Sequence, residues 1–154
     1  MLDATTFARL SRHAERTYPE EACALLMGPH VDGPTRRVLR ALPLPNSSAA
    51  DRSHRFEIPA RTLRALDEEP SDGENGIVGV FHSHPDGPSD PSEIDRENAL
   101  PSYAYLILEV DHGTARTWGA FELEPERRTF HRLSVSVHGI MPTANPSHGP
   151  REDR

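Results

Sequence analysis

The chain has 154 residues, a length that fits one domain with a real hydrophobic core. Its formal net charge of −7 gives no indication of a nucleic-acid-binding surface. A single cysteine, Cys23, rules out an intrachain disulfide, and the absence of a long apolar stretch argues against a signal peptide or a membrane span, so we expect a soluble, cytoplasmic protein.

The first half of the chain alternates between helical and strand-like patterns. The expected elements are a helix at 3–17, an apolar run at 21–28, a turn at 31–34, a strand at 36–44, a loop at 45–53, a strand-like alternation at 54–58 and a helix at 59–69. Asp3 or Thr5 can cap the first helix, and Pro59 is allowed at the first position of the last. The run at 21–28 fits a buried strand or the tail of a helix, and as a strand it could form a hairpin with the next run.

The second half is richer in strands. After a polar break at 70–76, the expected elements are a strand at 77–84, a loop at 85–91, a helix at 92–100, and strands at 102–110, 115–123 and 128–137. This order predicts an α/β (α+β) fold, a sandwich of helices around one mixed sheet. We assign the single domain to residues 1–140 and expect residues 141–154, rich in proline and polar residues, to be a disordered tail.

Two histidines stand at the end of the strand predicted at 77–84. His82 and His84 are two positions apart, so both imidazoles point to the same face of a strand and can converge on one metal ion. A catalytic zinc site needs a third protein ligand and an open position for water. Asp95 is the best candidate, because Ser92 as N-cap would place it in the first turn of a helix, where a carboxylate is favoured. The pair Ser92 and Asp95 is equally an ordinary capping box.

A hydrolytic zinc site also needs a proton carrier. Glu20 and Glu21 lie at the edge of the apolar run, where burial would raise the pKa of a carboxyl group. Both can equally be solvated loop residues. Cys23, inside the same run, is read as a buried structural thiol rather than a nucleophile.

The segment "HSHPDGPSDPSEID" resembles the JAMM (MPN+) metalloprotease motif, with His82, His84, Pro85, Ser92 and Asp95 at the spacing of that family. The upstream segment "YPEEACALLMG" is similar to the glutamate-containing strand of its small prokaryotic members. This resemblance implies a JAMM/MPN-like domain with a cytidine-deaminase-like sandwich.

The resemblance also implies roles for these residues. His82, His84 and Asp95 would bind one Zn²⁺ per chain, Glu21 would be the general base and then the general acid, and Ser92 would hydrogen-bond the oxyanion. As a helix cap, Ser92 accepts a hydrogen bond, so we expect its hydroxyl proton to remain free to donate. The implied reaction is hydrolysis of the amide bond after the C-terminal glycine of a ubiquitin-like or sulfur-carrier protein. The alternatives are a non-catalytic MPN-like binding module with structural or no zinc, and a metallohydrolase acting on a small peptide or amide.

Overall fold

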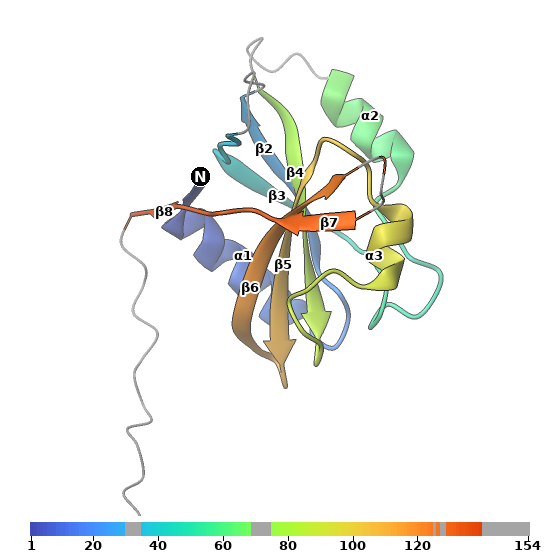
Figure 1. The fold of residues 1–154 in the computed structure, drawn as a ribbon. Helices are drawn as coiled ribbons and strands as arrows, with labels where there is room; N and C mark the ends of the chain where they lie inside the picture. The colour runs from blue at the N-terminus through green and yellow to red at the C-terminus, as the bar shows by residue number, and fades with distance from the viewer. Residues whose placement is uncertain (30–34, 69–74, 125, 127–128, 140–154) are drawn as a thin grey trace, which may run out of the picture.

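The structure, a computed structural model, describes residues 1–29, 35–68, 75–124, 126 and 129–139 (Figure 1). In chain order the elements are β1 (Leu2–Asp3), α1 (Ala4–Thr17), β2 (Cys23–Pro29), β3 (Arg40–Leu44), α2 (Ala60–Glu68), β4 (Asn75–Pro85), α3 (Glu93–Asn98), β5 (Ala104–Asp111), β6 (Thr114–Glu124), β7 (Thr129–Arg132) and β8 (Val137–His138). The turn expected at 31–34, most of the break at 70–76 and the tail at 141–154 lie outside the described residues. The division into a domain and a tail therefore stays a prediction.

The main sheet has six strands in the order β3-β2-β4-β5-β6-β7. Only the β4–β5 pair is parallel, so the sheet is mixed, as predicted. The apolar run at 21–28 becomes strand β2, and it forms the expected hairpin with β3, Cys23 opposite Leu44. Strands β5 and β6 are joined by His112 and Gly113, whose φ angles of 48° and 79° are those of a tight I′-type hairpin turn.

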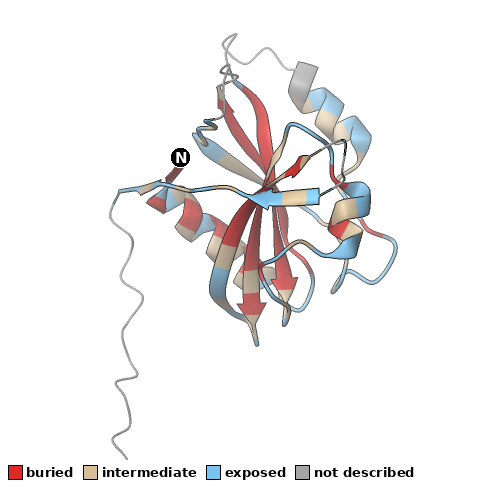
Figure 2. Cartoon of the chain, in the orientation of Figure 1, coloured by how far each residue is buried: buried red, intermediate tan, exposed pale blue. Residues whose placement is uncertain are grey.

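Each face of the sheet is covered by helices. Helix α1 begins at its cap Asp3, whose side chain accepts a hydrogen bond from Thr6 N, and it packs Phe7, Leu10 and Ala14 onto one face. Helix α2 and the end of α3 cover the other face with apolar residues (Leu63, Leu66 and Ala99 against Leu25, Met27, Val80 and Tyr105). Figure 2 shows buried strands in the centre of the molecule, while α2 at the periphery is coloured only as intermediate and exposed where it is described. This arrangement confirms the predicted α/β sandwich.

Several boundaries differ from the sequence-based prediction. Residues 54–58 form no strand, because their backbone bonds to the loop residues Asn46 and Ser47 instead of to a neighbouring strand. The strand expected over 36–44 begins only at Arg40. The strand expected over 128–137 is interrupted between β7 and β8, and β8 pairs with β1 in a separate two-stranded sheet. Helix α2 starts one residue after Pro59.

Candidate metal centre

The end of β4 and the starts of β2 and α3 supply the residues of the candidate site. Strand β4 ends at Pro85, directly after His82 and His84, and β2 begins at Cys23 opposite His82. The pairing continues one step further, since Ser83 N donates to Ala22 O at 3.0 Å and Ala22 N donates to Ser83 Oγ at 2.9 Å. Glu21 is consequently placed beside His84 on the same side of the sheet.

The side chains of His82, His84 and Asp95 converge on one point. The two Nε2 atoms of the histidines lie 3.0 Å apart. Asp95 Oδ1 lies 3.0 Å from His82 Nε2, and Asp95 Oδ2 lies 3.2 Å from His84 Nε2. Ligands of a tetrahedral zinc ion, with bonds of about 2.0–2.1 Å, stand about 3.3 Å apart. The three donor groups therefore have the chemistry and the mutual spacing of a metal site.

Hydrogen bonds outside this group fix one histidine. His84 Nδ1 lies 2.7 Å from the carbonyl oxygen of Pro88, which can only accept, so Nδ1 carries a proton, and in the neutral imidazole Nε2 is the nitrogen that presents a lone pair. His82 is fixed by packing instead. It is completely buried, its ring stacks on Phe56 with centroids 4.6 Å apart, and its Nδ1 has no partner among the described residues.

The electrostatics of the three groups are tightly coupled. Burial lowers the pKa of His82, which favours the neutral, metal-binding form. For His84, burial acts in the same direction, but the hydrogen bonds to Asp95 and Pro88 outweigh it and the pKa is raised. Burial alone would raise the pKa of Asp95, yet the adjacent His82 and His84 hold it far below its usual range. Asp95 is therefore a carboxylate, the form that binds metal.

Ser92 caps helix α3 and also holds Asp95. Its Oγ accepts a hydrogen bond from Asp95 N at 3.1 Å, and its backbone N donates to Asp95 Oδ2 at 2.7 Å, which completes the capping box. Its hydroxyl donates to the same Oδ2 at 2.7 Å. The sequence-based expectation of a free hydroxyl proton is thus wrong for this structure, because the Ser92 hydroxyl group already donates its hydrogen bond to Asp95 Oδ2. Asp95 Oδ2 accepts two hydrogen bonds from Ser92, so Oδ1 is the carboxylate oxygen with more lone-pair capacity left for a metal ion.

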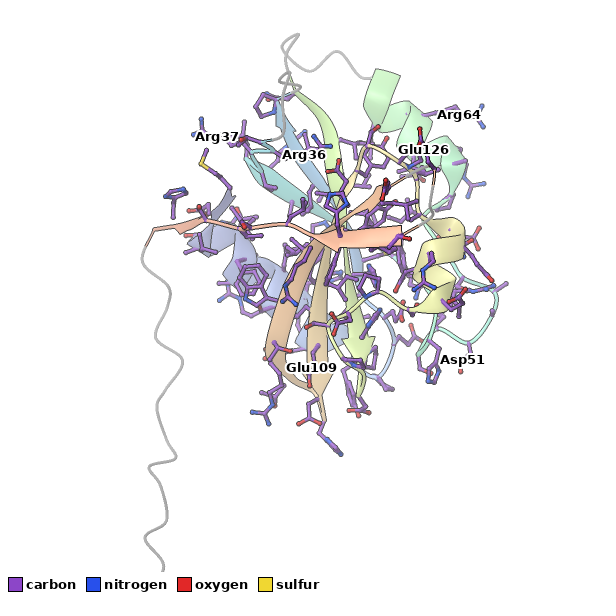
Figure 3. All side chains as sticks on the ribbon, viewed as in Figure 1. Arg36, Arg37, Asp51, Arg64, Glu109 and Glu126 are labelled. Atoms are coloured by element: carbon purple, nitrogen blue, oxygen red, sulfur yellow. The ribbon has the colours of Figure 1, made fainter. Side chains whose placement is uncertain are left out.

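Glu21 lies beside these groups without joining them. Its side chain is buried, only 5% exposed, and it lines a cavity of about 340 Å³ together with Asp95, Phe56 and Tyr105. Burial raises the pKa of Glu21 to about 8; the nearby His84 lowers it, and Asp95 and Asp51 raise it. Figure 3 shows Asp51 on the loop between β3 and α2. The neighbouring Glu20 is exposed instead and lies 3.8 Å from Arg52.

Other candidates have structural explanations. Cys23 is completely buried, and burial raises the pKa of its thiol to about 12, as expected of a structural thiol. His54 is an exposed residue paired with Asp51, at the rim of the Glu21 cavity. A larger cavity of about 480 Å³, lined by Arg36 and Val38, contains none of the site residues; Arg36 is labelled in Figure 3.

Two features were not predicted from the sequence. Phe56, which stacks on His82, was assigned to a strand, and its contact with the site has no local sequence signal. A second group, Asp86, Asp111 and His112, also brings possible ligand atoms together, but two of the three residues are exposed and none is buried. Asp86 there accepts hydrogen bonds from Tyr18 Oη and His112 N, which ties the segment before Glu21 to the β5–β6 turn. In the described part of the chain, none of the helices has the length and apolar character that crossing a bilayer demands.

Comparisons with known proteins identify a family and two named relatives. The family described as prokaryotic homologs of the JAB domain matches residues 3–121. Desampylase of Haloferax volcanii is 37% identical over 121 residues, which cover 77% of this chain and 79% of the relative. A probable TtuB-protein conjugate cleaving protease of Thermus thermophilus is 31% identical over 99 residues, 64% of this chain and 62% of the relative.

Solved structures share the fold. Protein DSY2949 of Desulfitobacterium hafniense superposes with a TM-score of 0.73 at 26% identity, covering 92% of this chain and 96% of the other. AF2198, a JAB1/MPN domain protein of Archaeoglobus fulgidus, superposes with a TM-score of 0.56 at 17% identity, covering 88% and 96%. The second likeness supports the fold alone.

Proposed function

The chain belongs to the family of prokaryotic JAB-domain homologs, and on that premise we propose that it is a zinc-dependent peptidase that hydrolyses the amide bond after the C-terminal glycine of a ubiquitin-like or sulfur-carrier protein. The observation that carries the proposal is the placement of Glu21. A buried carboxyl group with a raised pKa lines the same cavity as Asp95, next to a pair of histidines with metal-ligand spacing. The names of the two relatives, both enzymes that remove protein modifiers, support the substrate class.

His82, His84 and Asp95 are the proposed zinc ligands. Zinc, when bound there, supplies Lewis-acid chemistry: it lowers the pKa of water and polarises the amide carbonyl group. Three protein ligands among the described residues favour a catalytic over a structural site, because structural zinc sites are usually closed by four. This argues against the alternative of a binding module with structural zinc.

Glu21 is the proposed proton carrier. It accepts a proton from the attacking water as the water oxygen bonds to the carbonyl carbon, and it then gives that proton to the amine nitrogen as the C–N bond breaks. The products are a C-terminal carboxylate and a free amine. Burial raises the pKa of Glu21 in the metal-free protein, and a cation bound by the neighbouring ligands would lower it again, towards the range in which one carboxylate can accept a proton and then return it.

Ser92 is the proposed hydrogen-bond donor to the oxyanion. Its side chain lies at an exposed helix start, so a substrate can reach it. Its hydroxyl has to turn from Asp95 Oδ2 towards the substrate oxygen. The backbone N–H of Ser92 continues to hold Oδ2 at 2.7 Å after that change.

The test uses TtuB joined through its C-terminal carboxyl group to the lysine side chain of a reporter peptide. We expect cleavage by the zinc-loaded protein, inhibition by a chelator, and about one zinc per chain by elemental analysis. Glu21→Gln should lose at least about 100-fold in kcat with its zinc content unchanged. Glu20→Gln is the matched control, because Glu20 is adjacent but exposed. Equal activity of both variants, or cleavage that persists without metal, would contradict the proposal.

A further inference from the structure

The loop between β3 and α2 contains one side chain that hydrogen-bonds to the backbone of two separate stretches lining the Glu21 cavity. Asn46, two residues after β3 ends, uses its whole amide group. Its Nδ2 donates to Glu21 O at 3.1 Å and to Arg55 O at 2.9 Å. Its Oδ1 accepts from Ser48 N at 3.0 Å and from Glu57 N at 3.3 Å. Both donors and the acceptor capacity of the amide are therefore occupied.

These bonds matter because Glu21 precedes the regular sheet. Strand β2 starts at Cys23, so the sheet ladder leaves the backbone of Glu21 unsupported. The loop supplies the missing hydrogen bonds, since Glu21 N donates to Arg52 O at 2.7 Å and Glu21 O accepts from Asn46. The position of the Glu21 carboxyl group relative to the histidines therefore depends on the loop.

The same amide holds a second stretch of the cavity lining. By bonding Arg55 O and Glu57 N, it fixes the backbone on either side of Phe56. Phe56 stacks on His82, one of the proposed zinc ligands, and lines the cavity with Glu21. One side chain thus sets the distance between the proton carrier and the wall that packs on the metal site.

We propose that Asn46 is a positioning residue for the reaction, which acts by holding Glu21 and the Phe56 wall at a fixed separation. The inference rests on the proposed function for its kinetic part only. In this role Asn46 does not touch the reacting atoms. A displacement of a catalytic group by about 1 Å can cost about 100-fold in rate, so loss of these bonds should act on turnover rather than on substrate affinity.

The first variants are Asn46→Asp and Asn46→Ala. Aspartate keeps the size and the two accepted bonds but cannot donate to Glu21 O or Arg55 O, whereas alanine removes all four bonds without adding charge. Ser48→Ala is the matched control, because it removes the hydrogen bond from Ala50 N in the same loop and leaves the Asn46 amide intact. Zinc content and unfolding temperature are measured for each variant to establish that it folds.

We expect both Asn46 variants to lose about 10–100-fold in kcat with KM within about threefold, and Ser48→Ala to retain wild-type turnover. In a Glu21→Gln background, the Asn46 substitutions should cause no further loss, because residues that act as a unit are not additive. Three results would overturn the proposal. The Asn46 variants could keep wild-type kcat, the Asn46 substitutions could lower kcat by the same factor in the Glu21→Gln background, or Ser48→Ala could lose as much kcat as they do.

A second readout needs neither metal nor substrate. In the metal-free protein, the amide hydrogen of Glu21 should exchange with solvent at least about tenfold faster in Asn46→Ala than in wild type, because local opening of this segment becomes easier. Ser48→Ala should leave that rate unchanged. Unchanged exchange in Asn46→Ala would refute the positioning role, whatever the substrate proves to be. Faster exchange in a protein that cleaves no TtuB conjugate would support the positioning role and reject the proposed function.

Discussion

The raised pKa of Glu21 predicts that this residue destabilises the metal-free protein at neutral and alkaline pH. The pKa rises from an ordinary value of 4.5 to about 8 because the carboxyl group is buried. Between these two values the folded chain keeps a proton that the unfolded chain has released, so the free energy of unfolding falls as the pH rises. Well below pH 4.5 both states are protonated and the penalty vanishes.

The size of the effect follows from the shift. A difference of about 3.5 pKa units corresponds to roughly 5 kcal/mol at about 1.4 kcal/mol per unit, reached only above pH 8. The same linkage leaves a penalty of less than about 1 kcal/mol at pH 5. Glutamine has nearly the same shape and does not ionise. Glu21→Gln should therefore be more stable than wild type by roughly 3–5 kcal/mol at pH 8, and almost equal to it at pH 5.

Urea unfolding of metal-free protein at pH 5 and pH 8, with chelator present, measures this difference. Groups that titrate in both proteins cancel when the variants are compared, and Glu20→Gln serves as the control because its carboxyl group is exposed. Added zinc should shrink the difference, since a nearby cation favours the charged carboxylate. Parallel stability curves for wild type and Glu21→Gln from pH 5 to pH 8 would refute the reasoning.

Three further outcomes are expected. Ser92→Ala should lower zinc affinity about 10–100-fold by calorimetric titration, because Asp95 Oδ2 loses the hydroxyl donor at 2.7 Å; affinity equal to wild type would mean that the hydroxyl does not orient Asp95. Cys23 should resist thiol-reactive dyes at pH 8 in the folded protein and react fully in denaturant, because its thiol is buried and its pKa is raised to about 12; rapid labelling of native protein would contradict this. Gly79→Ala should cost about 1–3 kcal/mol in the free energy of unfolding, since the new Cβ would lie 2.4 Å from Ala104 O on the paired strand. An unchanged unfolding midpoint in urea would contradict this, because it would mean that β4 and β5 shift apart locally without cost.

Local sequence patterns predicted the elements around the site. The alternation of side chains in a strand was enough to place His82 and His84 on one face, and the capping pattern was enough to place Asp95 at a helix start. Glu21 could be distinguished from Glu20 only by its resemblance to the family. Glu21 is buried and Glu20 is exposed because of contacts with segments distant in sequence, which no local pattern encodes.

Interactions between segments distant in sequence were missed. The alternation in 54–58 is strand-like, but its backbone is bonded by Asn46 and Ser47, so it joins no sheet. Asn46 itself was one polar residue in a segment read as a loop. Ser92 was expected to keep its hydroxyl proton free, and only the three-dimensional position of Asp95 Oδ2 reveals the acceptor.

The proposed reactive groups stand at the ends of regular elements: the start of β2, the end of β4 and the first turn of α3. The loops between these ends form the border of the cavity but supply none of the proposed metal ligands. Loops tolerate insertion and sequence change far better than the elements they connect. Selection of a protein partner can therefore diverge in evolution while the hydrolytic chemistry is inherited unchanged. The condition is that new residues in the β3–α2 loop spare the amide bonds of Asn46 and the carbonyl oxygen of Arg52 that accepts from Glu21 N.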